Sequence, residues 1–172
     1  MSRDQQDQPQ IDPTLPEVVQ NFLRSGAHLE EIRLDARGRW THEGLDFENR
    51  KVVELFSRSI ARTPGGTWVL KIGHFTYPIV VEDVPYFVQG IRWNTSPPLL
   101  ELSDGTTEPL DPETLRYEPE GKLYTDVKDG AFRARFLRNA YYSVADRMGM
   151  DQGQLFLSVD DRRVPLAAID DL

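Results

Sequence analysis

A histidine and a glutamate stand side by side in the segment GRWTHEGLDFENR, residues 38–50. A zinc peptidase would need two histidines four residues apart on a helix, with a glutamate beside the first. Here position 46 is Asp, and Gly44 disfavours a helix. The pattern therefore favours a structural role, in which His42 and Glu43 hold the turn into the next helix and Glu43 accepts backbone N–H bonds at the helix start. A place in a ligand groove is the alternative.

A second acidic pair, Glu82 and Asp83, follows an apolar segment that is typical of a strand. Neighbouring strand residues point to opposite faces, so the two carboxylates do not aim at one site. An acid–base pair for hydrolysis is therefore poorly supported. A magnesium site built from Glu43, Glu82 and Asp83 is a minor alternative. We expect instead that one carboxylate pairs with Arg50 or Arg135 and joins two parts of the molecule.

Three arginines, Arg133, Arg135 and Arg138, form the most notable basic cluster. We expect them near the start of a helix, where positive charge is unfavourable unless an anion lies beside it. That anion is either a carboxylate of the protein itself or a bound phosphate-like ligand. The next helical turns carry Tyr141 and Tyr142, which either pack in the core or line the same groove.

The elements expected to position these residues alternate between helix and strand. We predict a short helix from Pro16 to Gly26, strands at 32–35 and 40–41 around a turn at 36–38, a helix from about 50 to 60 capped by Asp46 or Asn49, and a hairpin over 67–81. Strands at 87–93 and 99–102 follow, with a turn at 103–105. A second helix is predicted over 132–148, capped by Asp126 or Asp129.

The second part of the chain repeats the pattern of the first. LRYEPEGKLYTDV is similar to IRLDARGRWTHEG, and FRARFLRNAYYSVA is similar to FENRKVVELFSRSI. GQLFLSVDDRRVPLAAI is likewise similar to GTWVLKIGHFTYPIVVE. We therefore predict an α+β fold with two related halves from an internal duplication, each a strand–turn–strand–helix–hairpin unit. The halves span residues 15–98 and 99–172, after a disordered tail over residues 1–14.

Composition limits the classes of function. The 172 residues carry a net charge of −8 and no cysteine. Thiol nucleophiles and cysteine zinc sites are excluded, and DNA or long RNA is not the expected partner because the chain lacks the positive charge to neutralise phosphates. No apolar run is long enough to span a bilayer, and the N-terminus does not resemble a secretion signal. We expect a cytoplasmic protein with no membrane contact and no cofactor.

Several motifs together resemble a bacterial family, domain of unknown function 1285. They are GRWTHEG at residues 38–44, VEDVP at 81–85, and the segment from Arg138 to Tyr142. The resemblance covers roughly residues 28–168. It implies an α+β fold of two related halves, the second similar to a pleckstrin-homology barrel. It also implies a non-enzymatic protein with a part in signalling, binding a nucleotide-like ligand at the junction of the halves.

The function that we expect is the binding of a small anionic or nucleotide-like ligand between the two halves, without catalysis. Its predicted binding residues are His42, Glu43, Arg50, Glu82, Asp83, Arg135, Arg138 and Tyr142. One alternative is a protein–protein interaction module in which an exposed strand edge captures a peptide. A second alternative is a metal-assisted hydrolase that uses His42, Glu43, Glu82 and Asp83.

Overall fold

The structure is a computed structural model and describes residues 10–169. Its helices are α1 (Glu17–Arg24), α2 (Arg50–Ser59), the 3-10 turn η1 (Pro112–Thr114) and α3 (Arg138–Ala145). The strands of the N-terminal part are β1 (Ile32–Leu34), β2 (Trp40–His42), β3 (Leu45–Asp46), β4 (Ile60–Arg62), β5 (Trp68–Ile72), β6 (Phe75–Pro78) and β7 (Val80–Val81). Those of the C-terminal part are β8 (Tyr86–Arg92), β9 (Leu99–Leu102), β10 (Thr107–Pro109), β11 (Arg116–Glu118), β12 (Lys122–Val127), β13 (Phe132–Phe136), β14 (Met148–Asp151), β15 (Gln154–Val159), β16 (Arg162–Pro165) and β17 (Ala167–Ala168).

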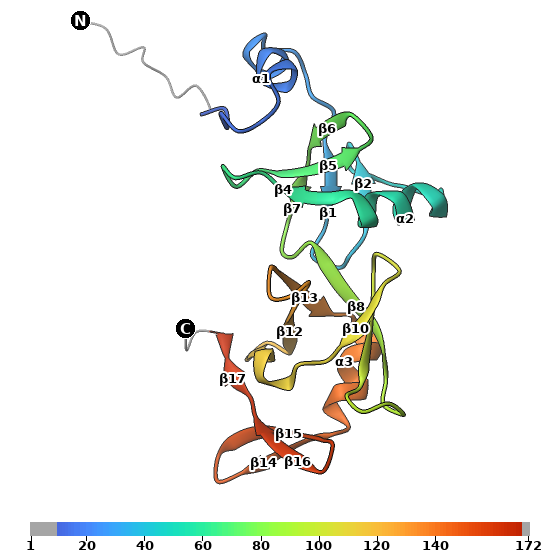
Figure 1. The fold of residues 1–172 in the computed structure, drawn as a ribbon, viewed down its shortest axis with the longest axis vertical. Helices are drawn as coiled ribbons and strands as arrows, with labels where there is room; N and C mark the ends of the chain where they lie inside the picture. Colours follow the sequence, from blue (N-terminus) through green and yellow to red (C-terminus); the bar gives the residue numbers. More distant parts are fainter. Residues whose placement is uncertain (1–9, 170–172) are drawn as a thin grey trace, which may run out of the picture.

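The chain forms two lobes along its long axis, with α1 to β7 in one and β8 to β17 in the other (Figure 1). The first lobe contains a four-stranded sheet in the order β3-β2-β1-β7 and the three-stranded sheet β4-β5-β6. The second contains a seven-stranded sheet in the order β10-β9-β8-β13-β12-β11-β17 and the three-stranded sheet β14-β15-β16. The predicted α+β class is confirmed. None of the four sheets is closed, so the pleckstrin-homology barrel expected for the second half is not confirmed.

Strand pairing follows the same scheme in both lobes. β1 pairs antiparallel with β2 and parallel with β7. β11 pairs antiparallel with β12 and parallel with β17. Arg33 and Arg116 hold matching positions, since each has a partner in both neighbouring strands. Strand pairing places the boundary between the lobes between β7 and β8. This position is earlier in the chain than the boundary that we expected after residue 98.

The segment before β1 is more ordered than the sequence suggested. Residues 1–9 of the expected disordered tail lie outside the described residues. Asp12, near the other end of that tail, accepts hydrogen bonds from the hydroxyls of Thr14, Thr63 and Thr67, the last at 2.7 Å. These bonds lower the pKa of its carboxyl. The prediction of disorder up to residue 14 is therefore wrong for residues 10–14, which are tied to the β4–β5 turn.

Helix α2 lies where the sequence predicted a helix from about 50 to 60. Asn49 is its N-cap, and the Asn49 side chain accepts hydrogen bonds from the N–H groups of Lys51 and Val52. One of the two predicted caps is thus confirmed. Ser57 on the buried face accepts a hydrogen bond from the Trp40 indole at 3.1 Å, which fixes the helix on β2.

The second predicted helix, over 132–148, is wrong in extent. Residues 132–136 form β13, and α3 begins only at Arg138, with Leu137 rather than Asp126 or Asp129 at its N-cap. The physical reason is that a spacing of four is common to a helix face and to every second residue of a strand. Phe132 and Phe136 follow the strand period, and β13 is paired on both sides, with β12 and β8.

Each lobe has its own apolar core. The larger core, in the second lobe, is centred on fully buried side chains that include Leu100, Leu115, Leu123 and Leu157. The core of the first lobe includes Trp40 and Leu70, together with Phe87 and Tyr124 from strands of the second lobe. The two lobes are therefore packed together through shared core residues, and this contact determines the geometry of the surface hollows beside it.

Candidate functional site

The His42-Glu43 pair lies at the hairpin turn between β2 and β3. Glu43 and Gly44 both have positive φ, 47° and 82°, which makes a tight two-residue turn. The Glu43 carboxylate accepts the backbone N–H of Glu31 at 2.7 Å and lies 3.0 Å from Nε2 of His28. These two hydrogen bonds lower the pKa of Glu43. The structural role is supported, although the N–H group that Glu43 binds belongs to the chain before β1 and not to a helix.

His42 has a similar local partner. Its Nε2 lies 2.7 Å from the Glu30 carboxylate, and its ring lies 6.0 Å from that of Phe47. Together, His42 and Glu43 tie the chain before β1 to the β2–β3 hairpin. Neither residue lines the crevice described below.

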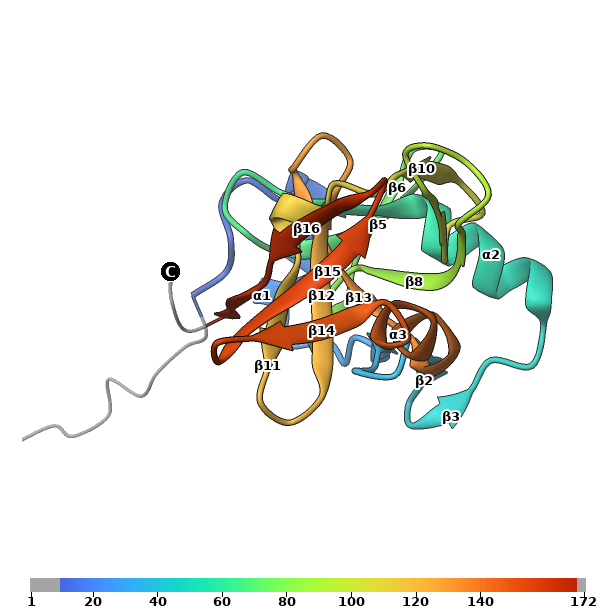
Figure 2. The ribbon, with the colours of Figure 1, turned by 90° about the horizontal axis from the view of Figure 1, so that it is seen from below.

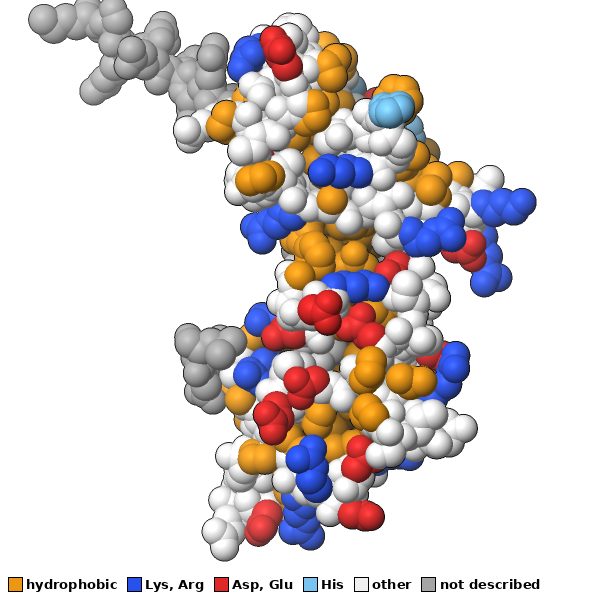
Figure 3. Space-filling view, viewed as in Figure 1, with side chains coloured by type: hydrophobic (Ala, Val, Ile, Leu, Met, Phe, Trp, Pro, Cys, Tyr) orange, Lys and Arg blue, Asp and Glu red, His pale blue; other side chains and the backbone are white. Residues whose placement is uncertain are grey.

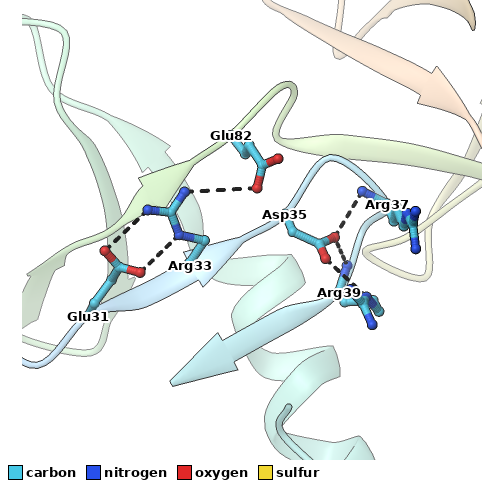
Figure 4. A network of polar contacts seen from close by, with 6 residues as sticks. All are labelled: Glu31, Arg33, Asp35, Arg37, Arg39 and Glu82. Carbon is cyan, nitrogen blue, oxygen red and sulfur yellow. Dashed lines mark hydrogen bonds and ion pairs between the residues drawn. The ribbon is translucent and has the colours of Figure 1, made fainter. Parts of the chain in front are cut away.

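Arg50 and Glu82 also engage neighbours within the first lobe. Arg50, at the start of α2, is 91% exposed and bonds Glu54 one turn later at 3.0 Å. Glu82 lies 3.8 Å from Arg33, which also bonds Glu31 at 2.9 Å (Figure 4). Arg33 thus links the segment after β7 to β1. Neither Arg50 nor Glu82 contributes to the crevice.

Asp83 and Arg135 form a polar contact at the junction of the lobes. Oδ2 of Asp83 accepts a hydrogen bond from the Tyr124 hydroxyl at 2.9 Å and from Nη1 of Arg135 at 3.3 Å. The same Arg135 nitrogen donates to the carbonyl of Ala36 at 2.9 Å. Burial, followed by the bond to Asp83, raises the pKa of Tyr124 well above its usual range. The predicted pairing of an acidic residue with Arg135 across the junction is confirmed.

An open crevice of about 730 Å³ lies beside this contact. The turn between β1 and β2 provides one wall, the turn between β11 and β12 another, and the start of α3 the floor. Its lining includes Ala36, Arg37, Gly121, Arg135, Arg138 and Tyr142. The volume is in the range of small-molecule sites. The crevice therefore brings together three of the eight predicted binding residues: Arg135, Arg138 and Tyr142.

The charge of the crevice is positive. Among residues 10–169, no carboxylate belongs to its lining, whereas Arg37, Arg135 and Arg138 do. Within residues 10–169, Arg135 pairs with Asp83, but neither Arg37 nor Arg138 has an ion-pair partner. Arg138 lies 5.7 Å from the ring centre of Tyr142, a side chain that is 53% exposed. Two arginines and an exposed aromatic ring can thus meet an anion with a flat group.

The turn that carries Arg37 is held firmly. The Asp35 carboxylate accepts the backbone N–H groups of Arg37 and Arg39 at 2.8 and 2.9 Å, and Nε of Arg39 at 3.0 Å (Figure 4). Burial raises the pKa of Asp35, but these bonds outweigh it and lower the pKa overall. Gly38 has φ of 80°, and a Cβ there would lie 3.1 Å from the Phe87 ring. The wall of the crevice is therefore a rigid turn.

A second hollow, of about 470 Å³, is lined in part by Asp83 and Tyr124. Its lining mixes Arg62 and Arg133 with Glu118 and Asp126. Arg133 lies 3.9 Å from Asp126. The basic and acidic side chains that line this hollow balance each other, so it is a weaker candidate for an anion-binding site than the crevice. Of the two anions predicted as partners of the arginine cluster, Arg133 thus has a carboxylate of the protein itself, that of Asp126.

The turn at residues 36–38 was predicted, but its place in a crevice, with Arg37 and Gly121 in the lining, was not. The only signal was the matching position of Gly38 and Gly121 in the two repeated segments. The residues required by a metal-assisted hydrolase do not converge, because His42 and Glu43 bond locally and Asp83 bonds Arg135. In the described part of the chain, no group of three or more histidine or acidic side chains is placed to hold a metal ion.

The fold and site define an α+β protein of two packed lobes with an arginine-lined crevice at their junction. Between residues 10 and 169, no helix combines the length and apolar character that a bilayer crossing requires. No protein-family model matches the sequence, and no curated protein matches it.

Two solved structures are similar to the chain. A DUF1285 family protein from Silicibacter pomeroyi DSS-3 has a TM-score of 0.62 and 17% identity, with 83% of this chain and 82% of that chain covered. A DUF1285 family protein from Shewanella baltica OS155 has a TM-score of 0.55 and 18% identity, with 70% of this chain and 94% of that chain covered. The chain therefore has the fold of these two DUF1285 family proteins, the family that its motifs resemble.

Proposed function

We propose that the crevice binds a small anionic or nucleotide-like ligand and that the protein acts without catalysis, as a ligand-responsive component of cytoplasmic signal transduction. One observation carries this proposal: Arg37 and Arg138 face the same crevice, and neither has an acidic partner within residues 10–169. A guanidinium is the side chain best suited to a phosphate, because its planar fork donates two parallel hydrogen bonds. The exposed Tyr142 ring supports a ligand with a flat part.

Arg135 has a different role in this proposal. Its guanidinium already bonds Asp83 and the Ala36 carbonyl, so it holds the β1–β2 turn against β13. Ligand contact would then come mainly from Arg37 and Arg138. His42, Glu43, Arg50 and Glu82 would have no direct contact with this ligand, whereas they belong to the predicted binding set.

The proposal includes an internal duplication as the origin of the two lobes. Support comes from the matching antiparallel and parallel partners of β1 and β11, and from the matching position of their first turns. In this view the crevice lies where the two repeated turns meet, Ala36 to Gly38 on one side and Gly121 on the other. The likeness of the second half to a pleckstrin-homology barrel stays a prediction.

A thermal-shift screen of the intact protein tests the proposal. The probes are inorganic phosphate, pyrophosphate, mononucleotides and cyclic dinucleotides. A ligand at about 100 times its Kd adds about 2.7 kcal/mol to the free energy of unfolding, which is a shift of about 5–10 °C for a chain of this size. Arg138→Ala is expected to abolish the shift while leaving the Tm of the free protein nearly unchanged.

Arg50→Ala is the matched control, because Arg50 and Arg138 are each the first residue of a helix. It is expected to keep the ligand shift. A flat screen with every probe, or equal loss in both variants, would contradict the proposal. A large fall in the Tm of free Arg138→Ala would also count against it and indicate a structural role.

A further inference from the structure

A smaller hollow, of about 190 Å³, adjoins the arginine-lined crevice. The two share part of their lining, because Gly121 and Tyr141 belong to both. The other walls of the smaller hollow come from β11 and β12, with the turn between them, and from the β14–β15 hairpin. Figure 2 shows β14 running from α3 towards β11. Helix α3 thus stands between the two hollows and contributes to each.

The lining of this smaller hollow is mainly apolar. Tyr117, Met148 and Leu155 line it, and each is a partly buried residue that packs against the core of the second lobe. The charged side chains of the lining, Glu118 and Lys122, bond each other at 2.9 Å. Their charges therefore balance, and we call this space the apolar hollow.

The border between the crevice and the apolar hollow is kept free by a glycine. Gly121 has φ of 86°, a conformation that favours glycine. A Cβ at this position would lie 3.8 Å from the Tyr141 hydroxyl. A side chain there would therefore occupy the space beside Tyr141, whereas with glycine a bound molecule can pass from the crevice into the apolar hollow.

The size and walls of the apolar hollow limit what it can hold. Its volume is about six times the ~30 Å³ that a water molecule occupies in the liquid, which is room for a chain of a few carbon atoms. On the face of the second lobe that Figure 3 shows, charged side chains of both signs separate the apolar ones. A lining that is mainly apolar therefore differs from that face and favours an apolar group.

We propose that the ligand of the crevice is an organic phosphate with a short apolar chain, whose phosphate contacts Arg37 and Arg138 and whose chain crosses Gly121 into the apolar hollow. This assignment rests on the proposed function, because the phosphate occupies the same crevice. The arginines bind the phosphate of any such compound, whereas the apolar hollow selects the chain. Each CH₂ group that is fully buried there lowers the Kd about fourfold.

Methyl phosphate and butyl phosphate test this assignment, because they share the head group and differ by three CH₂ groups. In calorimetric titration of the intact protein, we expect the Kd of butyl phosphate to be at least about tenfold lower. In 15N NMR spectra, both compounds should shift the amides of Arg37 and Arg138. Only butyl phosphate should also shift those of Leu123 and Leu155, which line the apolar hollow.

Met148→Trp is the variant that fills the apolar hollow. It should bring the Kd of butyl phosphate to within about twofold of that of methyl phosphate and leave methyl phosphate binding unchanged. Met150→Trp is the matched control, because Met150 lies on the same strand, is 69% exposed and is not part of the lining. It should keep the tenfold difference. If Met148→Trp does not fold, the wild-type amide shifts of Leu123 and Leu155 decide.

Equal Kd values for the two compounds in wild type, with shifts at Arg37 and Arg138, would overturn the apolar chain and leave the proposed function intact. Loss of the difference in both Trp variants would also overturn it, because the chain would then lie outside the apolar hollow. The absence of binding by either alkyl phosphate would do the same. The proposed function would fail with it only if every probe of the thermal-shift screen gave no shift.

Discussion

The β1–β2–β3 unit with α2 and the β11–β12–β13 unit with α3 have the same pairing scheme and different surroundings. In the second lobe, β8 to β10 extend the sheet, and α3 packs on β8. In the first lobe, the sheet stops at β3, and α2 has only Ser57 fully buried. Local sequence thus determines the hairpin and the helix, whereas burial depends on the strands that the rest of the chain packs against them. The better covered unit should therefore contribute more to stability.

The largest effect should come from truncating matched phenylalanines. Phe136→Ala removes a ring that is buried against β8, and we expect a loss of about 3–5 kcal/mol in the free energy of unfolding. Phe47→Ala removes a partly exposed ring and should cost about 1–2 kcal/mol. Urea unfolding followed by circular dichroism measures both. Equal losses would show that the two units do not differ in how much their phenylalanines contribute to stability.

The junction between the lobes should show the next largest effect. Asp83→Ala removes the acceptor of the buried Tyr124 hydroxyl and the partner of Arg135, so we expect a loss of about 1–3 kcal/mol. Glu82→Ala is the adjacent control. Its carboxylate makes only an exposed contact of 3.8 Å with Arg33, and the expected loss is about 0–1 kcal/mol. A greater loss for Glu82→Ala than for Asp83→Ala would show that Glu82, and not Asp83, is the carboxylate that stabilises the junction.

A pH effect is expected in the second lobe at Asp104. Burial raises the pKa of this carboxyl, but hydrogen bonds from Lys128 and Thr106 outweigh burial and lower it below 3.8. A lowered pKa means that the stabilisation is present at neutral pH and is lost as pH falls through the folded-state value. The free energy of unfolding of the wild type should exceed that of Asp104→Asn by about 1 kcal/mol at pH 7. The gap should close below about pH 3.8, and a constant gap in acid unfolding curves would contradict the assignment.

The smallest effect should come from the exposed edge. Leu45→Lys changes a side chain in water, so the free energy of unfolding should stay within about 0.5 kcal/mol of wild type. The matched change Ala134→Lys places a charge in the core and should prevent folding, because the site is fully buried. A marked loss with Leu45→Lys would show that β3 is already covered in the protein.

Local patterns predicted much of the fold. Pro16, Asn49 and the turn at Gly38 begin or end elements where their backbone preferences indicate. The prediction of a helix over 132–148 failed because the spacing of residues 132 and 136 fits a strand and a helix equally well. Strand pairing decides between them: β13 pairs with the neighbouring β12 and with β8, about 45 residues earlier in the chain. The contact with β8 is not contained in any local pattern.

The candidate site was less predictable than the fold. Arg138 and Tyr142 were predicted from their place on one helix, and both line the crevice. His42 and Glu43 were predicted from residue type alone, and their hydrogen bonds are local. Arg37 was missed because its importance arises from the distance between two turns, which depends on how the lobes pack.

An NMR titration with pyrophosphate and with AMP tests the central claim, that the arginine crevice binds an anion, most directly. With wild type, we predict that the amides of Arg37, Gly121 and Arg138 shift in a saturable way with at least one of the two ligands. These shifts should vanish in Arg138→Ala and persist in Arg50→Ala. Shifts centred elsewhere, or no saturable shift with either ligand, would contradict the claim.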